Sequence, residues 1–136
     1  MGDLGTKDTP RVVWEMSIRE LEEGWTTAFT DGSGIDDKAA GGFCSNPNRL
    51  DKDRQPDLSG GQYLGIKVTH FDGELAGIAL ALEGHNDTNT VTLLSDCKPA
   101  IRVVEKIDSG TVAPRSSIEA RIQLALETRK ARLQDT

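Results

Sequence analysis

The spacing of hydrophobic and polar positions changes along the chain, and these changes predict its elements. Between residues 62 and 70, Leu64, Ile66 and Val68 alternate with small or polar residues, which is typical of a half-buried strand. Three other short runs are rich in β-forming or small apolar residues and are bounded by turn residues. The four predicted strands are 25–31, 39–45, 62–70 and 90–95.

After the third strand the apolar residues recur at intervals of three and four, which predicts an amphipathic helix. Its apolar positions are Leu75, Ile78, Ala79 and Leu82. Asp72 is the expected N-cap of this helix and Gly84 its expected end.

Two further helices are predicted after the fourth strand. Pro99 suits the first turn of one of them, because proline lacks the N–H group that a first turn leaves unpaired. Ser116 and Glu119 have the spacing of a capping box, which predicts that the last helix begins there.

The order of these elements predicts an α/β domain. Three consecutive strands joined by short connections form an antiparallel meander, whereas a strand reached through a helix should lie parallel to the first. We therefore expect a mixed sheet, three antiparallel strands plus a parallel fourth, with helices packed on it.

The flanking segments set the predicted domain boundaries. Residues 1–24 are expected to be an N-terminal tail or linker, and within it residues 11–24 are compatible with a short helix or a linker. Residues 25–136 form the predicted domain. The segment 46–61 contains two prolines, three aspartates and a Gly-Gly pair, so it is expected to be an exposed loop longer than a hairpin needs.

Composition restricts the possible functions. The 136 residues carry a formal net charge of −6, which argues against nucleic-acid binding by overall charge alone and permits a cluster of carboxylates that holds divalent metal. The two cysteines do not suggest a disulfide framework, and no cysteine–histidine cluster has zinc spacing. No apolar stretch is long enough for a membrane span or a signal core, so we expect an intracellular protein without a membrane partner.

Three carboxylates stand at the ends of predicted elements. Asp31 closes the first strand, Glu74 lies in the first turn of the first helix, and Asp96 closes the fourth strand. If the first and fourth strands are parallel neighbours, Asp31 and Asp96 emerge side by side at their carboxyl ends. Taken singly, each residue is more often part of a turn, a solvated helix start or a helix cap than a metal ligand.

Converging carboxylates repel one another, and a bound cation relieves this repulsion. Mg²⁺ prefers such oxygen ligands. Two ions about 4 Å apart can activate water and stabilise the leaving oxygen in phosphodiester cleavage.

The residues around these carboxylates resemble the signatures of ribonuclease H domains of the reverse-transcriptase type, particularly those of fungal non-LTR retroelements. The first signature is Thr30-Asp31-Gly32-Ser33-Gly34, the second runs from Phe71-Asp72-Gly73-Glu74 to Ile78, and the third is Leu94-Ser95-Asp96-Cys97 and onward to Ile101. The similarity extends from about Thr26 to Ile107.

This resemblance implies a function for the chain. Asp31, Glu74 and Asp96 would be catalytic ligands of a site for two Mg²⁺ ions, with Mn²⁺ as a possible substitute. The site would hydrolyse the RNA strand of an RNA–DNA hybrid. Gly32, Ser33 and Gly73 flank these ligands and would let a sugar–phosphate chain approach. A reverse transcriptase domain upstream is the expected partner.

The chain also departs from the family. A fourth acidic ligand is expected after a fifth strand, but nothing beyond Ser116 matches, and Asp135 has suitable chemistry but lies in a tail. We therefore expect the domain to be incomplete at its C-terminal end, its fifth strand missing and the fourth strand left as an exposed edge. The alternative function is a truncated or degenerate ribonuclease H-like module without catalysis, acting in structure or interaction.

Other candidate residues receive simpler interpretations. His70 and His85 are isolated and are expected at the surface or at strand ends, and Cys97 is expected to fill a small buried space. The last helix is basic, which predicts either a solvated face or a contact with a phosphate backbone. Its basic residues are Arg115, Arg121, Arg129, Lys130 and Arg132.

Overall fold

The computed structural model describes residues 11–13, 26–35, 38–46, 58–66, 68–85 and 91–134. They form five strands and three helices. The strands are β1 (Arg11–Val13), β2 (Thr26–Ile35), β3 (Lys38–Asn46), β4 (Leu58–Ile66) and β5 (Val91–Leu94). The helices are α1 (His70–Gly84), α2 (Lys98–Asp108) and α3 (Ser117–Gln134).

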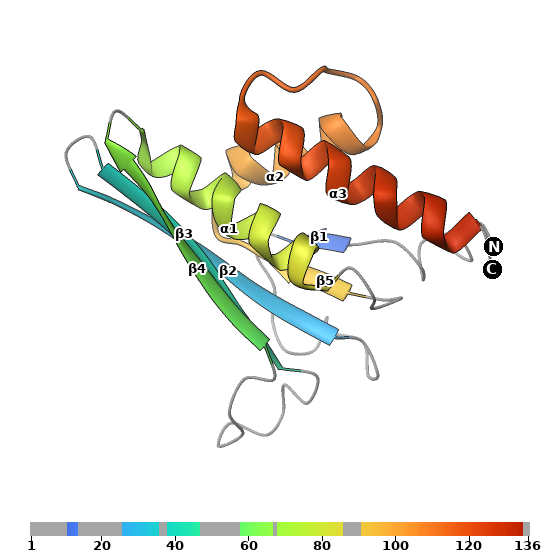
Figure 1. Ribbon diagram of the computed structural model, residues 1–136, viewed down its shortest axis with the longest axis horizontal. Helices are drawn as coiled ribbons and strands as arrows, with labels where there is room; N and C mark the ends of the chain where they lie inside the picture. The colour runs from blue at the N-terminus through green and yellow to red at the C-terminus, as the bar shows by residue number, and fades with distance from the viewer. Residues whose placement is uncertain are drawn as a thin grey trace.

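The strands form one mixed sheet in the order β1-β5-β2-β3-β4. β2, β3 and β4 are an antiparallel meander, and β5 is parallel to β2, as the element order predicts. Figure 1 shows α1 lying along one face of the sheet, with α2 and α3 beyond it. The predicted mixed α/β sheet with packed helices is confirmed.

The N-terminal segment differs from the prediction. Residues 11–13 are neither a helix nor a linker, because they form β1 and pair in parallel with β5, from Arg11 opposite Thr92 to Val13 opposite Leu94. A fifth strand is therefore present in the described sheet, supplied from the N-terminal side, and β5 is an inner strand. No strand follows β5 among the described residues, as expected, but β1 occupies the position beside it, so the expectation of an exposed edge on β5 is wrong.

The start of α1 also differs from the prediction. Thr69, not Asp72, is the N-cap, and the two residues form a reciprocal capping box. The Thr69 hydroxyl oxygen accepts from the Asp72 N–H at 3.1 Å, and the Asp72 carboxylate accepts from the Thr69 N–H at 2.9 Å. This box begins the helix at His70, so β4 ends at Ile66, before the predicted end of the strand at residue 70. β4 also begins at Leu58, before the predicted start at residue 62. The expected end of α1 at Gly84 is confirmed.

The core lies between the sheet and the helices. α1 contributes an unbroken run of buried residues from Gly73 to Ala79, because sheet and helices enclose it on several sides. α2 instead buries one face, formed by Ala100, Ile101, Val104 and Ile107. At the start of α3 the Ser116 hydroxyl accepts from the Glu119 N–H at 3.1 Å, which confirms the predicted cap.

The positive charges on α3 are mostly engaged within the fold. Arg121 pairs with Glu83, with 2.7 Å between Nη2 and Oε1, and Lys130 pairs with Asp108 at 2.7 Å. Arg129 is 2% exposed and donates to the carbonyl oxygen of His85. Burial makes both sequence-based alternatives, a solvated face and a phosphate contact, wrong for Arg129, whereas the side chains of Arg121 and Lys130 are 30% and 43% exposed and lie at the surface as paired cations. No described helix is long and apolar enough to cross a bilayer.

Candidate metal centre

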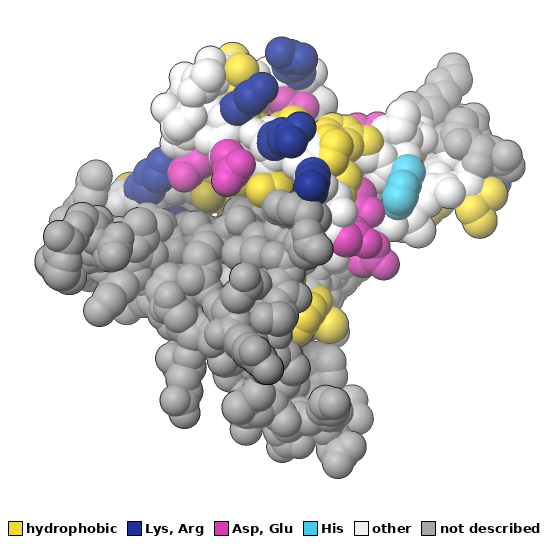
Figure 2. Space-filling model, turned by 180° about the vertical axis from the view of Figure 1, so that it is seen from behind, with side chains coloured by type: hydrophobic (Ala, Val, Ile, Leu, Met, Phe, Trp, Pro, Cys, Tyr) yellow, Lys and Arg dark blue, Asp and Glu magenta, His cyan; other side chains and the backbone are white. Residues whose placement is uncertain are grey.

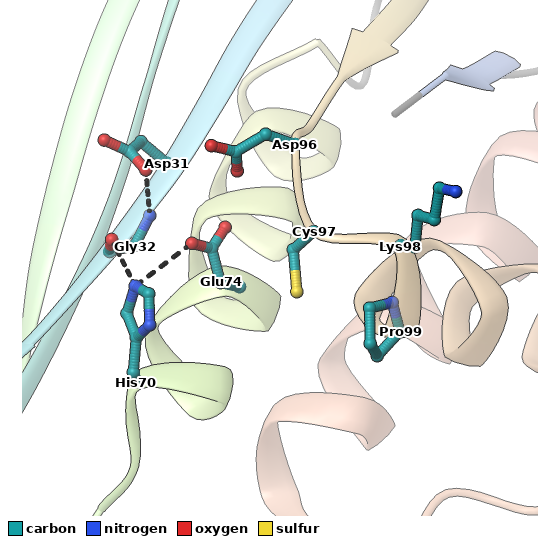
Figure 3. A pocket seen from close by; sticks show the side chains of 8 residues that line it. All are labelled: Asp31, Gly32, His70, Glu74, Asp96, Cys97, Lys98 and Pro99. Atoms are coloured by element: carbon teal, nitrogen blue, oxygen red, sulfur yellow. Dashed lines mark hydrogen bonds and ion pairs between the residues drawn. The ribbon is translucent and has the colours of Figure 1, made fainter. Parts of the chain in front are cut away.

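The three carboxylates predicted from the sequence converge in the structure. One oxygen atom from each of Asp31, Glu74 and Asp96 lies within 4.8 Å of the others. Figure 3 shows the three side chains pointing toward one another from β2, α1 and the segment after β5.

Strand register explains why two of these residues meet. Phe29 of β2 lies opposite Leu94 of β5, the last pair of this parallel ladder. Asp31 and Asp96 each follow two residues later, so they leave the ladder together. Asp31 does not close its strand as predicted, since β2 continues to Ile35 against β3, but it stands where the pairing with β5 ends.

A buried hydrogen bond ties the two strands together just before they separate. The Thr30 hydroxyl donates to the carbonyl oxygen of Leu94 at 3.0 Å, and the Thr30 side chain is on the buried side of β2. Because the bond joins the residues that precede Asp31 and Ser95, it limits how far the two acidic side chains can move apart.

Glycine residues bring Glu74 to the other two carboxylates. A Cβ atom on Gly32 would overlap the backbone nitrogen of Glu74, and one on Gly77 would lie 2.9 Å from the carbonyl oxygen of Asp31. Helix α1 therefore packs directly on the backbone of β2, closer than any side chain would permit. The same contact places Gly73 against β3, where its Cβ position faces the carbonyl oxygen of Ala40 at 2.5 Å.

The electrostatic environment of Glu74 is unusual for a carboxylate. The residue is 3% exposed, and its Oε2 atom is buried without a hydrogen-bond partner among the described residues. Burial raises the pKa of Glu74, and the negative charges of Asp96 and then Asp31 raise it further, while His70 and the backbone N–H of Gly32 partly offset these effects. An unpaired buried carboxylate oxygen is costly, and a cation at this point would remove the cost.

His70 lies at the surface, as expected, but it is not isolated, because it belongs to this centre. Its Nε2 atom lies 2.9 Å from the carbonyl oxygen of Gly32 and 3.2 Å from Oε1 of Glu74. Because a carbonyl oxygen only accepts, Nε2 carries the hydrogen and can donate to both oxygens. The i,i+4 spacing of His70 and Glu74 on one helix is the sequence signal that could have revealed the contact.

Asp31 and Asp96 are more open than Glu74. Both are exposed, and the Asp31 carboxylate accepts from the N–H of Gly32 at 2.9 Å. They line an open pocket on the surface together with Glu74 and five other residues: Gly32, His70, Cys97, Lys98 and Pro99. One buried and two accessible carboxylates leave room for water and substrate oxygens around a bound cation.

The remaining sequence-based candidates have other positions. Cys97 is half-buried and packs against the core, as expected of a small filler, and it also lines the pocket. His85 is buried after α1, where its ring meets Phe43 edge-on at 5.7 Å, away from the pocket lining. Ser33 is exposed and Gly32 lines the pocket, whereas Gly73 is buried in the helix–sheet contact. Asp135 lies outside the described residues.

The sheet order and the helices on it define the ribonuclease H fold, and solved structures of that class match the chain. At the level of sequence, no protein-family model and no curated protein matches it. The ribonuclease H1 of the halophilic archaeon Halobacterium salinarum is 21% identical, with a TM-score of 0.51 over 79% of this chain and 78% of that one.

Two other structures extend the comparison. The solution structure of the PFV ribonuclease H domain gives a TM-score of 0.57 at 18% identity, covering 75% of this chain and 72% of that domain. LC11-RNase H1, solved in complex with an RNA/DNA hybrid, gives 0.54 at 13% identity, covering 78% of this chain and 77% of that one. At these identities the likeness establishes the fold, and the chemistry has to be argued from the site itself.

Proposed function

We propose that the chain is a metal-dependent endonuclease that hydrolyses the RNA strand of RNA–DNA hybrids. The observation that carries this proposal is the meeting of Asp31, Glu74 and Asp96 within 4.8 Å, with a buried Glu74 oxygen that lacks a partner. A protein that used these residues only as a turn, a helix start and a cap would gain nothing from placing three like charges together.

The donor set fits hard divalent cations. Three carboxylates, two of them exposed, offer oxygen ligands and open coordination positions, which suits Mg²⁺ and also Mn²⁺. Asp31, Glu74 and Asp96 would hold the ions, and two ions would supply an activated water and charge stabilisation at the leaving oxygen.

The chain's own residues have distinct parts in this arrangement. Glu74 is fixed by burial and by the Nε2–H group of His70, so its carboxylate needs little reorganisation when a cation binds. Asp31 is oriented by the N–H of Gly32. Asp96 is exposed and lines the pocket two residues after the end of β5, where a scissile phosphate would enter.

Gly32 and Ser33 are the proposed points of backbone approach, since Gly32 lines the pocket and Ser33 is exposed beside it. Gly73 contributes indirectly, because its lack of a side chain lets α1 pack closely on the sheet beside Ser33. Contacts with the 2′-hydroxyl groups of one strand would distinguish a hybrid from a DNA duplex, and little sequence preference is expected. LC11-RNase H1, which has the same fold, binds such a hybrid in its solved complex. The signature motifs further suggest a retroelement enzyme acting beside a reverse transcriptase.

The experiment compares an RNA–DNA hybrid, a DNA duplex and an RNA duplex of one sequence at equal Mg²⁺ concentration. Cleavage of only the RNA strand of the hybrid, lost on addition of EDTA and in Glu74→Gln, supports the proposal. Cleavage of the DNA duplex, or a Glu74→Gln variant as fast as wild type, would refute it. A folded protein that binds Mg²⁺ but cleaves none of the substrates would favour the non-catalytic module instead.

A further inference from the structure

A row of positive side chains follows the exposed face of α2. Lys98, Arg102 and Lys106 are spaced four residues apart, so they stand one above another on the helix, and all three are exposed. We call these three residues the α2 basic row. Figure 2 shows Lys and Arg side chains in a row on the same face of the molecule as acidic side chains and a histidine.

The α2 basic row begins at the metal centre. Lys98 lines the same pocket as Asp31, Glu74 and Asp96, and Figure 3 shows its amine pointing away from the three carboxylates. From Lys98 to Lys106 the helix rises about 12 Å at 1.5 Å per residue. The row therefore leads outward from the site instead of neutralising it.

The charges of Arg102 and Lys106 are not paired among the described residues in the way those of α3 are. Among the residues that the structure describes, neither Arg102 nor Lys106 forms an ion pair through its side chain. The nearby Asp108 is paired with Lys130. Glu105 is the remaining acidic residue of α2, so the helix surface keeps an excess of positive charge.

Helix stability does not explain the row. Like charges at i,i+4 disfavour a helix, and the row contains two such pairs. Lys98 lies at the N-terminal end of α2, where the helix dipole disfavours a cation and where no acidic residue stands in the first turn. Only Lys106, in the last turn, is favourably placed with respect to the dipole.

We propose that the α2 basic row binds the sugar–phosphate backbone of the duplex whose scissile phosphate lies at the carboxylates. This inference rests on the proposed function and deepens it, because it identifies the surface that holds the substrate. A single strand carries a phosphate about every 3.4 Å along the duplex axis, so the row spans roughly three or four phosphates. Continuity with the pocket favours a polymeric anion that passes through the site over a separate acidic protein.

The α2 basic row also explains how a negatively charged protein could bind a negatively charged nucleic acid. The chain has a net charge of −6 and three converging carboxylates, both of which repel a polyanion. A local stripe of cations at the edge of the site provides attraction where the substrate has to lie. Since phosphates are common to all nucleic acids, this surface contributes affinity without distinguishing a hybrid from a DNA duplex.

The test measures binding of a fluorescent hybrid and a DNA duplex by anisotropy over a range of salt concentrations, in a Glu74→Gln background that prevents hydrolysis. The variants are Arg102→Gln, Lys106→Gln and the two combined. Arg121→Gln is the matched control, because it removes one positive charge that is already paired with Glu83 of α1 and leaves the Asp108–Lys130 pair beside the row intact. Thermal melting checks that each variant is folded.

The combined variant is expected to bind both duplexes on the order of tenfold more weakly, and the slope of log affinity against log salt should fall by about 1.8 for two lost contacts. Arg121→Gln should change neither quantity. Weakening no greater than that of the control, or a wild-type chain that binds no duplex at low salt, overturns the proposal. A protein that keeps Glu74 and carries the combined substitution could also cleave the hybrid and bind it with wild-type affinity. That result would refute the role of the α2 basic row in binding and leave the proposed function intact.

Discussion

The Nε2 atom of His70 lies 3.2 Å from Oε1 of Glu74, one helical turn further along α1. The imidazole is 62% exposed at its side chain, whereas the carboxylate is 4% exposed, so the histidine forms the outer wall of the acidic site. A metal ligand commonly depends on such a hydrogen-bond donor for its orientation.

Replacing His70 by alanine should therefore weaken Mg²⁺ or Mn²⁺ binding by about tenfold, in the range typical of partners that orient a ligand. His70→Gln keeps an N–H donor on a side chain of similar reach and should restore most of the affinity. Calorimetric titration of the two variants measures this difference. Equal affinities in wild type and His70→Ala would show that the contact does not orient Glu74.

Gly32→Ala should destabilise the fold, because the added methyl group would overlap the backbone of Glu74 and push α1 off the sheet. Overpacking of this kind costs about 1–3 kcal/mol. Gly61→Ala is the matched control, since its Cβ would lie 3.7 Å from the nearest atom, and its effect should stay within about 0.5 kcal/mol. Urea unfolding compares them, and equal midpoints for the two variants would contradict the packing argument.

The stability of the metal-free protein should depend on pH through Glu74. Its pKa is raised by burial, then by Asp96 and Asp31, above the value of 4.5 for a free side chain. Between 4.5 and the raised pKa, the folded protein holds a proton that the unfolded chain has released. The free energy of unfolding therefore falls as pH rises through this interval and stays reduced above it.

Glu74→Gln has no such proton and should be more stable than wild type at neutral pH in EDTA. Its advantage should shrink as pH falls through the interval, because wild type then takes up the proton. Urea titrations of both proteins at several pH values measure the difference. An advantage of Glu74→Gln that does not change with pH would contradict the assignment of this effect to Glu74.

The positions of Asp31 and Asp96 could be predicted from the sequence because they depend on the order of elements. A strand, a crossover helix and a parallel strand bring Asp31 and Asp96 to one end of the sheet whatever the details of packing. Glu74 could be included only through motif resemblance, since its approach depends on Gly32 and Gly77 meeting across the helix–sheet contact.

Other features could not be predicted because several weak signals compete. A three-residue strand such as β1 has too few positions to show an alternation, and its pairing with β5 is a long-range contact. Alternating residues beyond Ile66 suggested a longer third strand, but the reciprocal bonds of Thr69 and Asp72 begin a helix there. The number of basic residues in α3 suggested a solvated face or a phosphate contact. The pairing of Arg121 with Glu83 and of Lys130 with Asp108 can be seen only in three dimensions.

The claim on which the whole account depends is that Asp31, Glu74 and Asp96 form one site for divalent cations. Calorimetric titration with Mg²⁺ and Mn²⁺ tests it most directly, with Asp31→Asn and Asp96→Asn as site variants and Glu127→Gln, an exposed carboxylate of α3, as the control. The account predicts that wild type and Glu127→Gln bind the cations with the same affinity. In both site variants the affinity should fall by about tenfold or more, at least as much as the loss of a residue that only orients a metal ligand. Equal binding by all four proteins, or no binding to wild type, would contradict it.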